Sequence, residues 1–252
     1  CRDCKTPISP RYPLVEALYA VAALTVADRI FRADPVFALS TATALFLLRF
    51  AFVWGLLTAA FIDLDWFLLP DAITLTGIVV GIAAAFVLPG VGWQSALEGA
   101  ALGAAILYSL HFVWSRFLKR EGMGLGDVKL LAMIGAFLGP IGVIFALVAG
   151  SVQGILAMVI SRLTGWQIGP DPSLLEDDDE AEEDEAVEVS DAARETARSP
   201  AAETPAEGAQ EPAPGVLRTL IPFGPFLALA AIEYLLGADT VVKDLWRSLT
   251  EG

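Results

Sequence analysis

The sequence contains few charged residues for its length. Only 18% of its 252 residues are charged, while 56% are apolar and the mean hydropathy is +0.62. Soluble domains of this size are closer to a quarter charged. The composition therefore excludes most soluble folds and indicates a protein that lies largely within a membrane.

Histidine and cysteine are scarcer still. The single histidine, His111, has no second histidine with which to share a metal or a proton, so we expect it to have a packing or interfacial role. The two cysteines form one Cys-x-x-Cys pair, Cys1 and Cys4. A tetrahedral zinc site needs four ligands, so this pair supplies half of a possible zinc site, and the alternative is two free thiols.

Acidic residues are concentrated in one segment. The net charge is −14, and residues 171–214 hold 16 of the 30 acidic residues but only two of the 16 basic ones. The rest of the chain is therefore neutral. Because this segment lacks aromatic residues and cannot bury enough apolar surface to offset its ordering entropy, we expect a disordered loop.

Long apolar runs occupy most of the remaining chain. Runs long enough to cross a bilayer as helices, about 17–25 residues, lie near 14–31, 40–62, 73–89, 96–117 and 221–237. A further run, 128–163, is too long for one span and is interrupted at Gly139-Pro140, which predicts two short spans that meet there. The sequence therefore predicts an all-α polytopic membrane bundle of about seven transmembrane helices.

Lysine and arginine indicate the orientation of this bundle. With seven crossings, eleven of these residues fall on the face that carries the N-terminus and the acidic segment, and four fall on the other face. The first face is therefore expected to be cytoplasmic. Four parts follow: 1–13, a remnant of a Cys-x-x-Cys region; 14–163, the transmembrane core; 164–220, the acidic cytoplasmic loop; and 221–252, the last helix and a tail. Because the chain begins at Cys1 without a methionine, we also expect further sequence upstream.

Two aspartates at the ends of predicted spans need an explanation. Ionisable groups at membrane depth cost roughly 2.5–3.5 kcal/mol on insertion scales and are functional candidates. Asp63 closes the second span and Asp127 opens a later one, with two crossings between them. Because an even number of crossings returns the chain to the same face, the two carboxylates can meet there.

A pair of carboxylates supplies the groups that amide hydrolysis requires. One, ionised, acts as a general base on water, and the other, protonated, polarises the carbonyl and then protonates the leaving amine. Gly124 and Gly126 leave the backbone before Asp127 open to an extended peptide. Lys129, two residues beyond Asp127, is a candidate for stabilising the ionised aspartate or for extending to the lipid headgroups.

Each aspartate also has a purely structural interpretation. Helix starts favour Asp, so Asp127 alone could be an N-cap, and Asp71 after Pro70 is expected to cap the helix that follows. Asp65, two residues from Asp63, would point elsewhere on a helix and is expected to be solvated. The joint pattern of Asp63 and Asp127, rather than either residue alone, favours a catalytic pair.

Four ordered motifs resemble the prepilin peptidases, or type IV leader peptidases, which are membrane aspartic proteases of the Gly-x-Gly-Asp type. The motifs are residues 10–16, Ile62-Asp63 with Pro70-Asp71, residues 124–131 and residues 221–226. The resemblance covers nearly the whole chain apart from 171–214, and it implies that Asp63 and Asp127 are the catalytic pair. Family members typically have eight spans, so the first span and part of the cysteine region are expected to be missing here.

The resemblance implies an endopeptidase in the bacterial cytoplasmic (inner) membrane. It would remove the leader of type IV prepilins or of type II secretion pseudopilins at the cytoplasmic face, after a glycine, and would need no cofactor for proteolysis. Many family members also N-methylate the new N-terminus with S-adenosylmethionine, and their methylating variants carry two Cys-x-x-Cys pairs. S-adenosylmethionine and zinc are therefore expected only for a longer chain. The expected partners are prepilins and the lipid bilayer, with no nucleic acid.

Two other classes of function remain open from the residues alone. A proton- or ion-coupled transporter could use intramembrane aspartates, although Asp63 and Asp127 are expected at one face rather than near the midplane. A non-catalytic scaffold of a secretion system is the third possibility, and in that case the two aspartates need not lie together.

Overall fold

The computed structural model describes residues 11–33, 39–114, 116, 124–164, 222–238, 240–242 and 248. Every regular element within these residues is helical, which confirms the all-α class. Cys1, Cys4 and the whole acidic segment 171–214 lie outside them, so the predictions made for those residues stay predictions.

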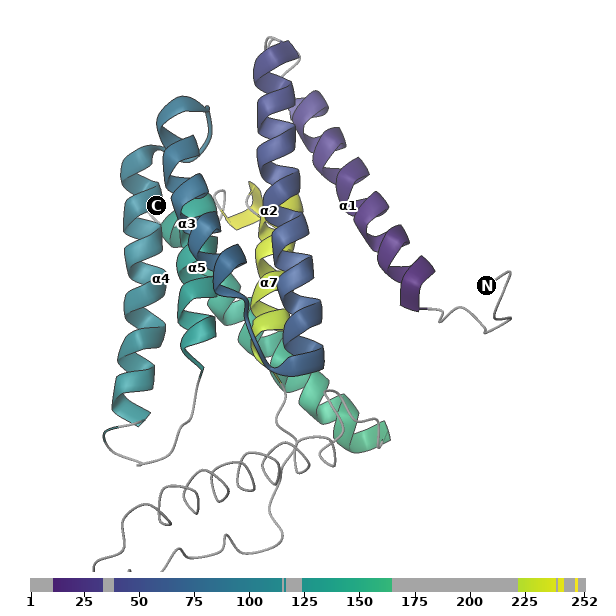
Figure 1. Ribbon diagram of the computed structural model, residues 1–252, viewed down its shortest axis with the longest axis vertical. Helices are drawn as coiled ribbons and strands as arrows, with labels where there is room; N and C mark the ends of the chain where they lie inside the picture. Colours follow the sequence, from purple (N-terminus) through teal and green to yellow (C-terminus); the bar gives the residue numbers. More distant parts are fainter. Residues whose placement is uncertain are drawn as a thin grey trace, which may run out of the picture.

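Six α-helices and a short π-helix make up the described part of the chain, and the α-helices form a bundle (Figure 1). They are α1 (Arg11–Ala33), α2 (Leu39–Trp66), α3 (Asp71–Val87), α4 (Trp93–Val113), α5 (Leu125–Thr164) and α7 (Gly224–Glu233), with the π-helix η2 (Tyr234–Ala238) after α7. Helices α2, α4 and α5 are long and apolar enough to cross a membrane, while α3 and α7 with η2 are shorter apolar helices. The structure therefore supports a membrane-embedded bundle, and the count of seven crossings stays a prediction.

The long helix α5 contains the break that the sequence predicts. Gly139 has φ 73° and ψ −176°, which is outside helical geometry, and Pro140 follows it. A positive φ is readily adopted by glycine, and proline has no N–H to continue a helical hydrogen-bond ladder. The second part of α5 consequently runs in a different direction from the first (Figure 1).

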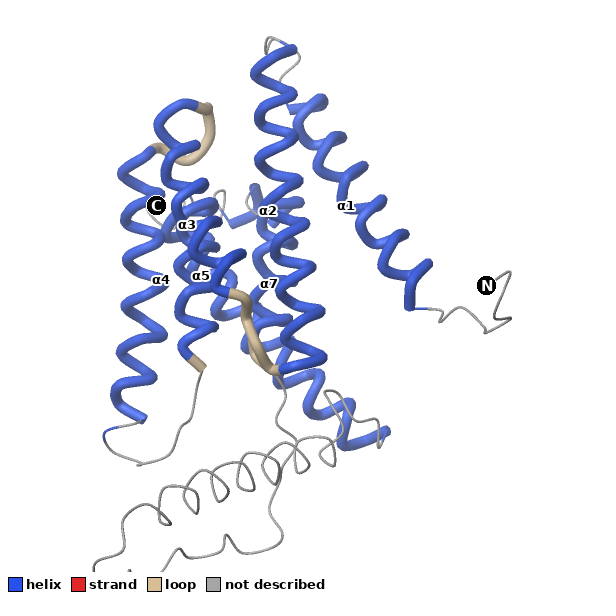
Figure 2. The backbone as a smooth tube through the Cα atoms, in the orientation of Figure 1, coloured by secondary structure: helices blue, strands red, loops and turns tan. Residues whose placement is uncertain are grey.

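Two described connections mark opposite ends of the bundle (Figure 2). Residues 67–70 join α2 to α3 at one end, and residues 88–92 join α3 to α4 at the other. Leu88 has an extended backbone, as expected of a residue that precedes proline, and this ends α3. The start of α5 lies at the same end as the α2–α3 connection (Figure 2), so the C-terminal end of α2 and the N-terminal end of α5 share one end of the bundle.

The core is built around α5, which contacts α3, α4 and α7. Leu130 and Leu131 are fully buried there. The contact between α4 and α5 is so close that a methyl group at Gly99 would collide with the backbone oxygen of Gly135. Backbone therefore packs against backbone at this crossing, which fixes the start of α5 within the bundle.

Helix α1 is attached less extensively than the others. It leans away from α2 over much of its length (Figure 1). A hydrogen bond between the Tyr19 hydroxyl and Thr58 Oγ1, 2.9 Å long, joins the two helices. The bundle that positions the site below is therefore formed by α2, α3, α4, α5 and α7.

Candidate active site

Asp63 lies in the last turn of α2 and is the buried acidic side chain of the described residues, with 5% of its surface exposed. A buried carboxylate needs hydrogen-bond donors to offset the loss of water. The backbone N–H of Gly224, at the start of α7, donates to it. Within the part of the chain that the structure describes, Asp63 Oδ2 has no hydrogen-bond partner. The end of α2 and the start of α7 thus meet at this carboxylate.

Asp127 is carried to the same place by α5. It is half-buried, and its carboxylate interacts electrostatically with that of Asp63. The structure therefore brings together the two aspartates that the sequence singled out. Because α5 begins at Leu125, Asp127 is the third residue of the helix and not the residue before its first turn, so the N-cap interpretation is not supported.

One residue of the α2–α3 connection, Leu69, lies between the segments that carry these groups. A methyl group at Gly126 would be 2.9 Å from Leu69 Cβ and 3.1 Å from its Cδ1. A methyl group at Gly224 would be 3.4 Å from Leu69 Cδ1 and would collide with Asp63 Oδ2. The site is therefore a three-way contact among the end of α2, the start of α5 and the start of α7, with Leu69 packed between them.

Gly124 and Gly126 differ in their surroundings. Among the described residues, a methyl group at Gly124, which is exposed, would meet only the backbone nitrogen of Gly126, at 3.9 Å. Gly126 is partly buried and leaves room for Leu69. The structure thus adds a packing reason for Gly126, while the predicted role of both glycines in substrate access stays a prediction.

Lys129 binds the carboxylate of Asp71, whereas the sequence suggested that of Asp127. Its Nζ donates to Asp71 Oδ1 over 2.6 Å, which links the starts of α5 and α3. Asp71 is the first residue of α3, whose N-cap is Pro70, and no side chain caps this helix. The prediction that Asp71 caps α3 was therefore wrong, and the ion pair takes Lys129 to Asp71 instead of Asp127.

This ion pair should contribute little to stability, because the Lys129 and Asp71 side chains are 33% and 58% exposed. Exposed pairs are worth about 0.2–1 kcal/mol. We expect Lys129→Gln, Asp71→Asn and the double variant to give a coupling energy in that range when the unfolding of the full chain is followed in detergent. A coupling energy of about 2 kcal/mol or more would contradict this expectation.

Metal ligands do not cluster in the described part of the chain. None of its residues form a group of three or more His, Cys, Asp or Glu side chains that could hold an ion. The half zinc site predicted at Cys1 and Cys4 lies outside that part and stays a prediction.

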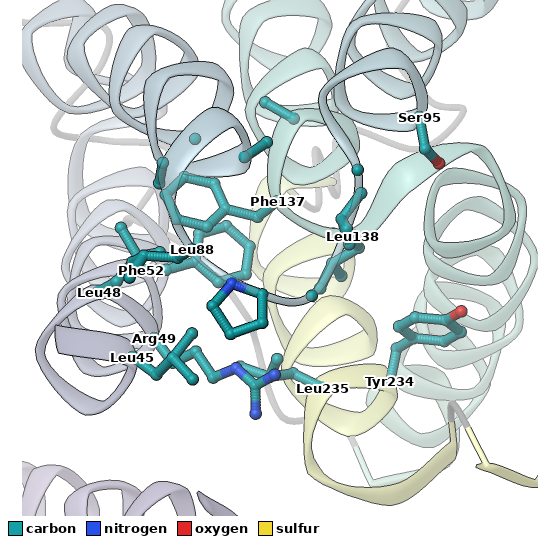
Figure 3. Close-up of a pocket in the computed structure, with 18 of the residues that line it drawn as sticks. Leu45, Leu48, Arg49, Phe52, Leu88, Ser95, Phe137, Leu138, Tyr234 and Leu235 are labelled. Atoms are coloured by element: carbon teal, nitrogen blue, oxygen red, sulfur yellow. The ribbon is translucent and has the colours of Figure 1, made fainter. Parts of the chain in front are cut away.

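A cavity of about 390 Å³ lies toward the other end of the bundle. Its lining includes Arg49 on α2, Leu88 before the α3–α4 turn and Leu138 at the break in α5. Figure 3 shows Arg49 extending from α2 toward Leu235 on η2. Arg49 precedes Asp63 by about 21 Å along the helix at 1.5 Å per residue. The cavity is therefore separate from the aspartate pair.

The sequence did not indicate the roles of two residues at the site, Leu69 and Gly224. Residues 221–226 were noted only as a motif, without a role for the Gly224 N–H, and Leu69 was one apolar residue among many. The only feature of the sequence that marks these two residues is that each directly precedes a proline, Leu69 before Pro70 and Gly224 before Pro225. Their roles depend on contacts between distant segments.

Comparison with known proteins identifies the family to which this chain belongs. Residues 50–159, which include both aspartates, match the type IV leader peptidase family. A prepilin leader peptidase/N-methyltransferase of Myxococcus xanthus (strain DK1622) is 32% identical over 253 residues, which cover 94% of this chain and 72% of that protein. The chain belongs to the type IV leader peptidase family. No solved structure gives a significant match.

Other members of the leader peptidase family match over shorter stretches. A prepilin leader peptidase/N-methyltransferase of Aeromonas hydrophila is 39% identical over 62% of this chain and 51% of its own length. A type 4 prepilin-like proteins leader peptide-processing enzyme of Escherichia coli O78:H11 is 34% identical over 69% of this chain and 62% of its own length. The chain thus spans about half to two thirds of the length of these two relatives.

Proposed function

We propose that this leader peptidase family member is a membrane aspartic endopeptidase that removes the leader peptide of type IV prepilins or pseudopilins. The observation that carries the proposal is that Asp63 and Asp127 lie at one end of the bundle, close enough for their carboxylates to interact electrostatically. Two carboxylates that share a poorly hydrated site can supply the general base and the general acid that hydrolysis of an amide requires. The printed names of the relatives supply the class of substrate.

The chemistry needs one ionised and one protonated carboxyl group. The ionised aspartate accepts a proton from a water molecule as the water oxygen attacks the scissile carbonyl carbon. The protonated aspartate donates a hydrogen bond to the carbonyl oxygen and stabilises the tetrahedral intermediate. When the C–N bond breaks, a carboxyl group returns a proton to the leaving amine. The products are the free leader and the mature pilin with a new amino terminus.

The position of the pair fits a substrate that enters from the membrane surface. Both aspartates lie within the terminal turns of helices that are long enough to cross a membrane, at the end of the bundle that holds the α2–α3 connection. We propose that this end is the cytoplasmic face of the bacterial inner membrane, in accord with the distribution of Lys and Arg. An extended leader would approach along the exposed backbone at Gly124.

The relatives' names also include N-methyltransferase. No feature of the described residues identifies a site for S-adenosylmethionine, and Cys1 and Cys4 lie outside them. The proposal for this chain is therefore confined to peptide hydrolysis, and methylation and zinc binding stay predictions.

A reconstitution experiment tests the proposed function. The purified full chain is placed in liposomes with a type IV prepilin, and the new amino terminus of the product is read by mass spectrometry. We expect one new terminus, at the junction between the leader and the mature pilin. An intact prepilin after long incubation would contradict the proposal. In parallel, ion flux that depends on Asp63 would favour the transporter alternative, which the family relationship does not support.

A further inference from the structure

The cavity beside the α3–α4 turn is lined both by a cation and by apolar side chains. Phe52 on α2 and Phe137 on α5 stack with their ring centroids 4.2 Å apart, and both line the cavity. Figure 3 shows the Arg49 guanidinium away from these two rings, toward Leu235. Within the described part of the chain, the lining includes no acidic residue. A ligand that matches this cavity therefore needs an anionic part and an apolar part.

The cavity also lies where a lipid leaflet would meet the bundle. Helix α3 has 17 residues, so it is about 26 Å long at 1.5 Å per residue. The hydrocarbon core of a bilayer is about 30 Å thick, so the two ends of α3 lie near the two membrane faces. The turn after α3 lines the cavity, and its Pro89, Gly90 and Gly92 are exposed. The cavity therefore opens near the head groups of the leaflet opposite the aspartate pair.

Arg49 has the chemistry that recognises a phosphate. An ionisable side chain at membrane depth is costly and is a functional candidate for that reason. A guanidinium donates two parallel hydrogen bonds to the oxygens of a phosphate, which a lysine cannot do. Arg49 also interacts within the chain, and the five N–H donors of a guanidinium allow it to bind a ligand at the same time. The phosphate of a lipid head group is an acceptor of the right charge at this depth.

We propose that this cavity binds one anionic phospholipid, with the phosphate on Arg49 and part of an acyl chain against the apolar wall. The cavity volume of about 390 Å³ lies within the range of small-molecule sites, about 300–1,000 Å³. A soluble anion would occupy the polar part alone, whereas an acyl chain also removes the apolar wall from water. An anionic head group fits better than a zwitterionic one, because no ammonium group offsets its attraction to the guanidinium.

Native mass spectrometry of the purified full chain in an uncharged detergent measures this binding. The chain is titrated with phosphatidylglycerol and, separately, with phosphatidylcholine that has the same acyl chains. We expect one phosphatidylglycerol per chain, bound about tenfold or more tightly than phosphatidylcholine. Equal affinity for the two lipids would overturn the inference. Displacement of the lipid by millimolar inorganic phosphate would also overturn it, because the acyl chain would then contribute nothing.

Two variants test the two parts of the cavity separately. Arg49→Gln should weaken phosphatidylglycerol binding by about 10- to 100-fold, because it removes a charged hydrogen-bond donor. Ala85→Phe keeps Arg49 but fills the cavity that Ala85 lines, so it should also weaken binding, and it replaces Arg49→Gln if that variant does not fold. Arg32→Gln is the matched control, because the Arg32 side chain is 81% exposed on α1, and its affinity should be unchanged. The inference fails if either folded cavity variant binds phosphatidylglycerol as tightly as the unaltered chain.

Discussion

Asp63→Asn should reduce leader cleavage by about 10²- to 10⁴-fold, and Asp127→Asn should do the same, because each removes one of the two groups that move protons in the reaction. Asparagine keeps nearly the shape of aspartate but neither accepts a proton from water nor donates one to the amine. The two carboxylates are close enough to interact electrostatically, so the loss of either also changes the charge that the other experiences. The measurement is kcat/KM for prepilin cleavage by the purified variants.

Asp65→Asn is the matched control for this prediction. Asp65 lies on the same turn of α2, two residues from Asp63, but its side chain is exposed. We expect this variant to cleave at close to the rate of the unaltered chain. The role given to the pair would be contradicted if a folded Asp63→Asn or Asp127→Asn variant retained more than about a tenth of the activity.

Gly224→Ala should cause the second-largest loss. The added methyl group would collide with Asp63 Oδ2 and would lie 3.4 Å from Leu69 Cδ1, so the Asp63 carboxylate must move. A misplacement of about 1 Å in a catalytic group can cost 10²-fold in rate. We therefore expect kcat to fall by roughly that factor, while the amount of folded protein and its melting temperature change little.

Gly154→Ala provides the comparison for Gly224→Ala. Gly154 also faces a residue of α7, but a methyl group there would be 3.6 Å from Phe226 Cδ2, an ordinary van der Waals contact. Its activity should match that of the unaltered chain. If Gly224→Ala were as active as Gly154→Ala, the contact between the start of α7 and Asp63 would have no part in catalysis.

The features that the sequence predicted well depend on local signals. The break at Gly139-Pro140 follows from the chemistry of two adjacent residues, and the structure confirms it. The meeting of Asp63 and Asp127 follows from counting apolar runs, because two crossings return the chain to the same face. Neither inference requires knowledge of which helices touch.

The features that the sequence missed depend on contacts between distant segments. Lys129 lies two residues from Asp127, yet its side chain extends to Asp71 on α3. Nothing in the order of residues indicates that Leu69 packs between Gly126 and Gly224, because the three come from separate segments. Electrostatic and packing partners of this kind are set by the way the helices cross, which spacing along the chain does not reveal.

The same distinction explains why the glycines were only partly understood. Gly126 was predicted to open the backbone to a substrate, and the structure shows in addition that it makes room for Leu69. Gly224 was noted only within a motif, although its N–H is a donor to Asp63 and its lack of a side chain accommodates that carboxylate. One residue type thus serves access, packing and hydrogen bonding within a single site.

The most direct test of the central claim, that Asp63 and Asp127 act as one catalytic unit, is the residual cleavage rate of the double variant Asp63→Asn/Asp127→Asn. Residues that work as a unit give strongly non-additive losses. If the two aspartates act as one unit, the cleavage rate of the double variant should equal that of the slower single variant within about threefold. If instead the two losses multiply, the aspartates contribute independently, and the paired mechanism is contradicted.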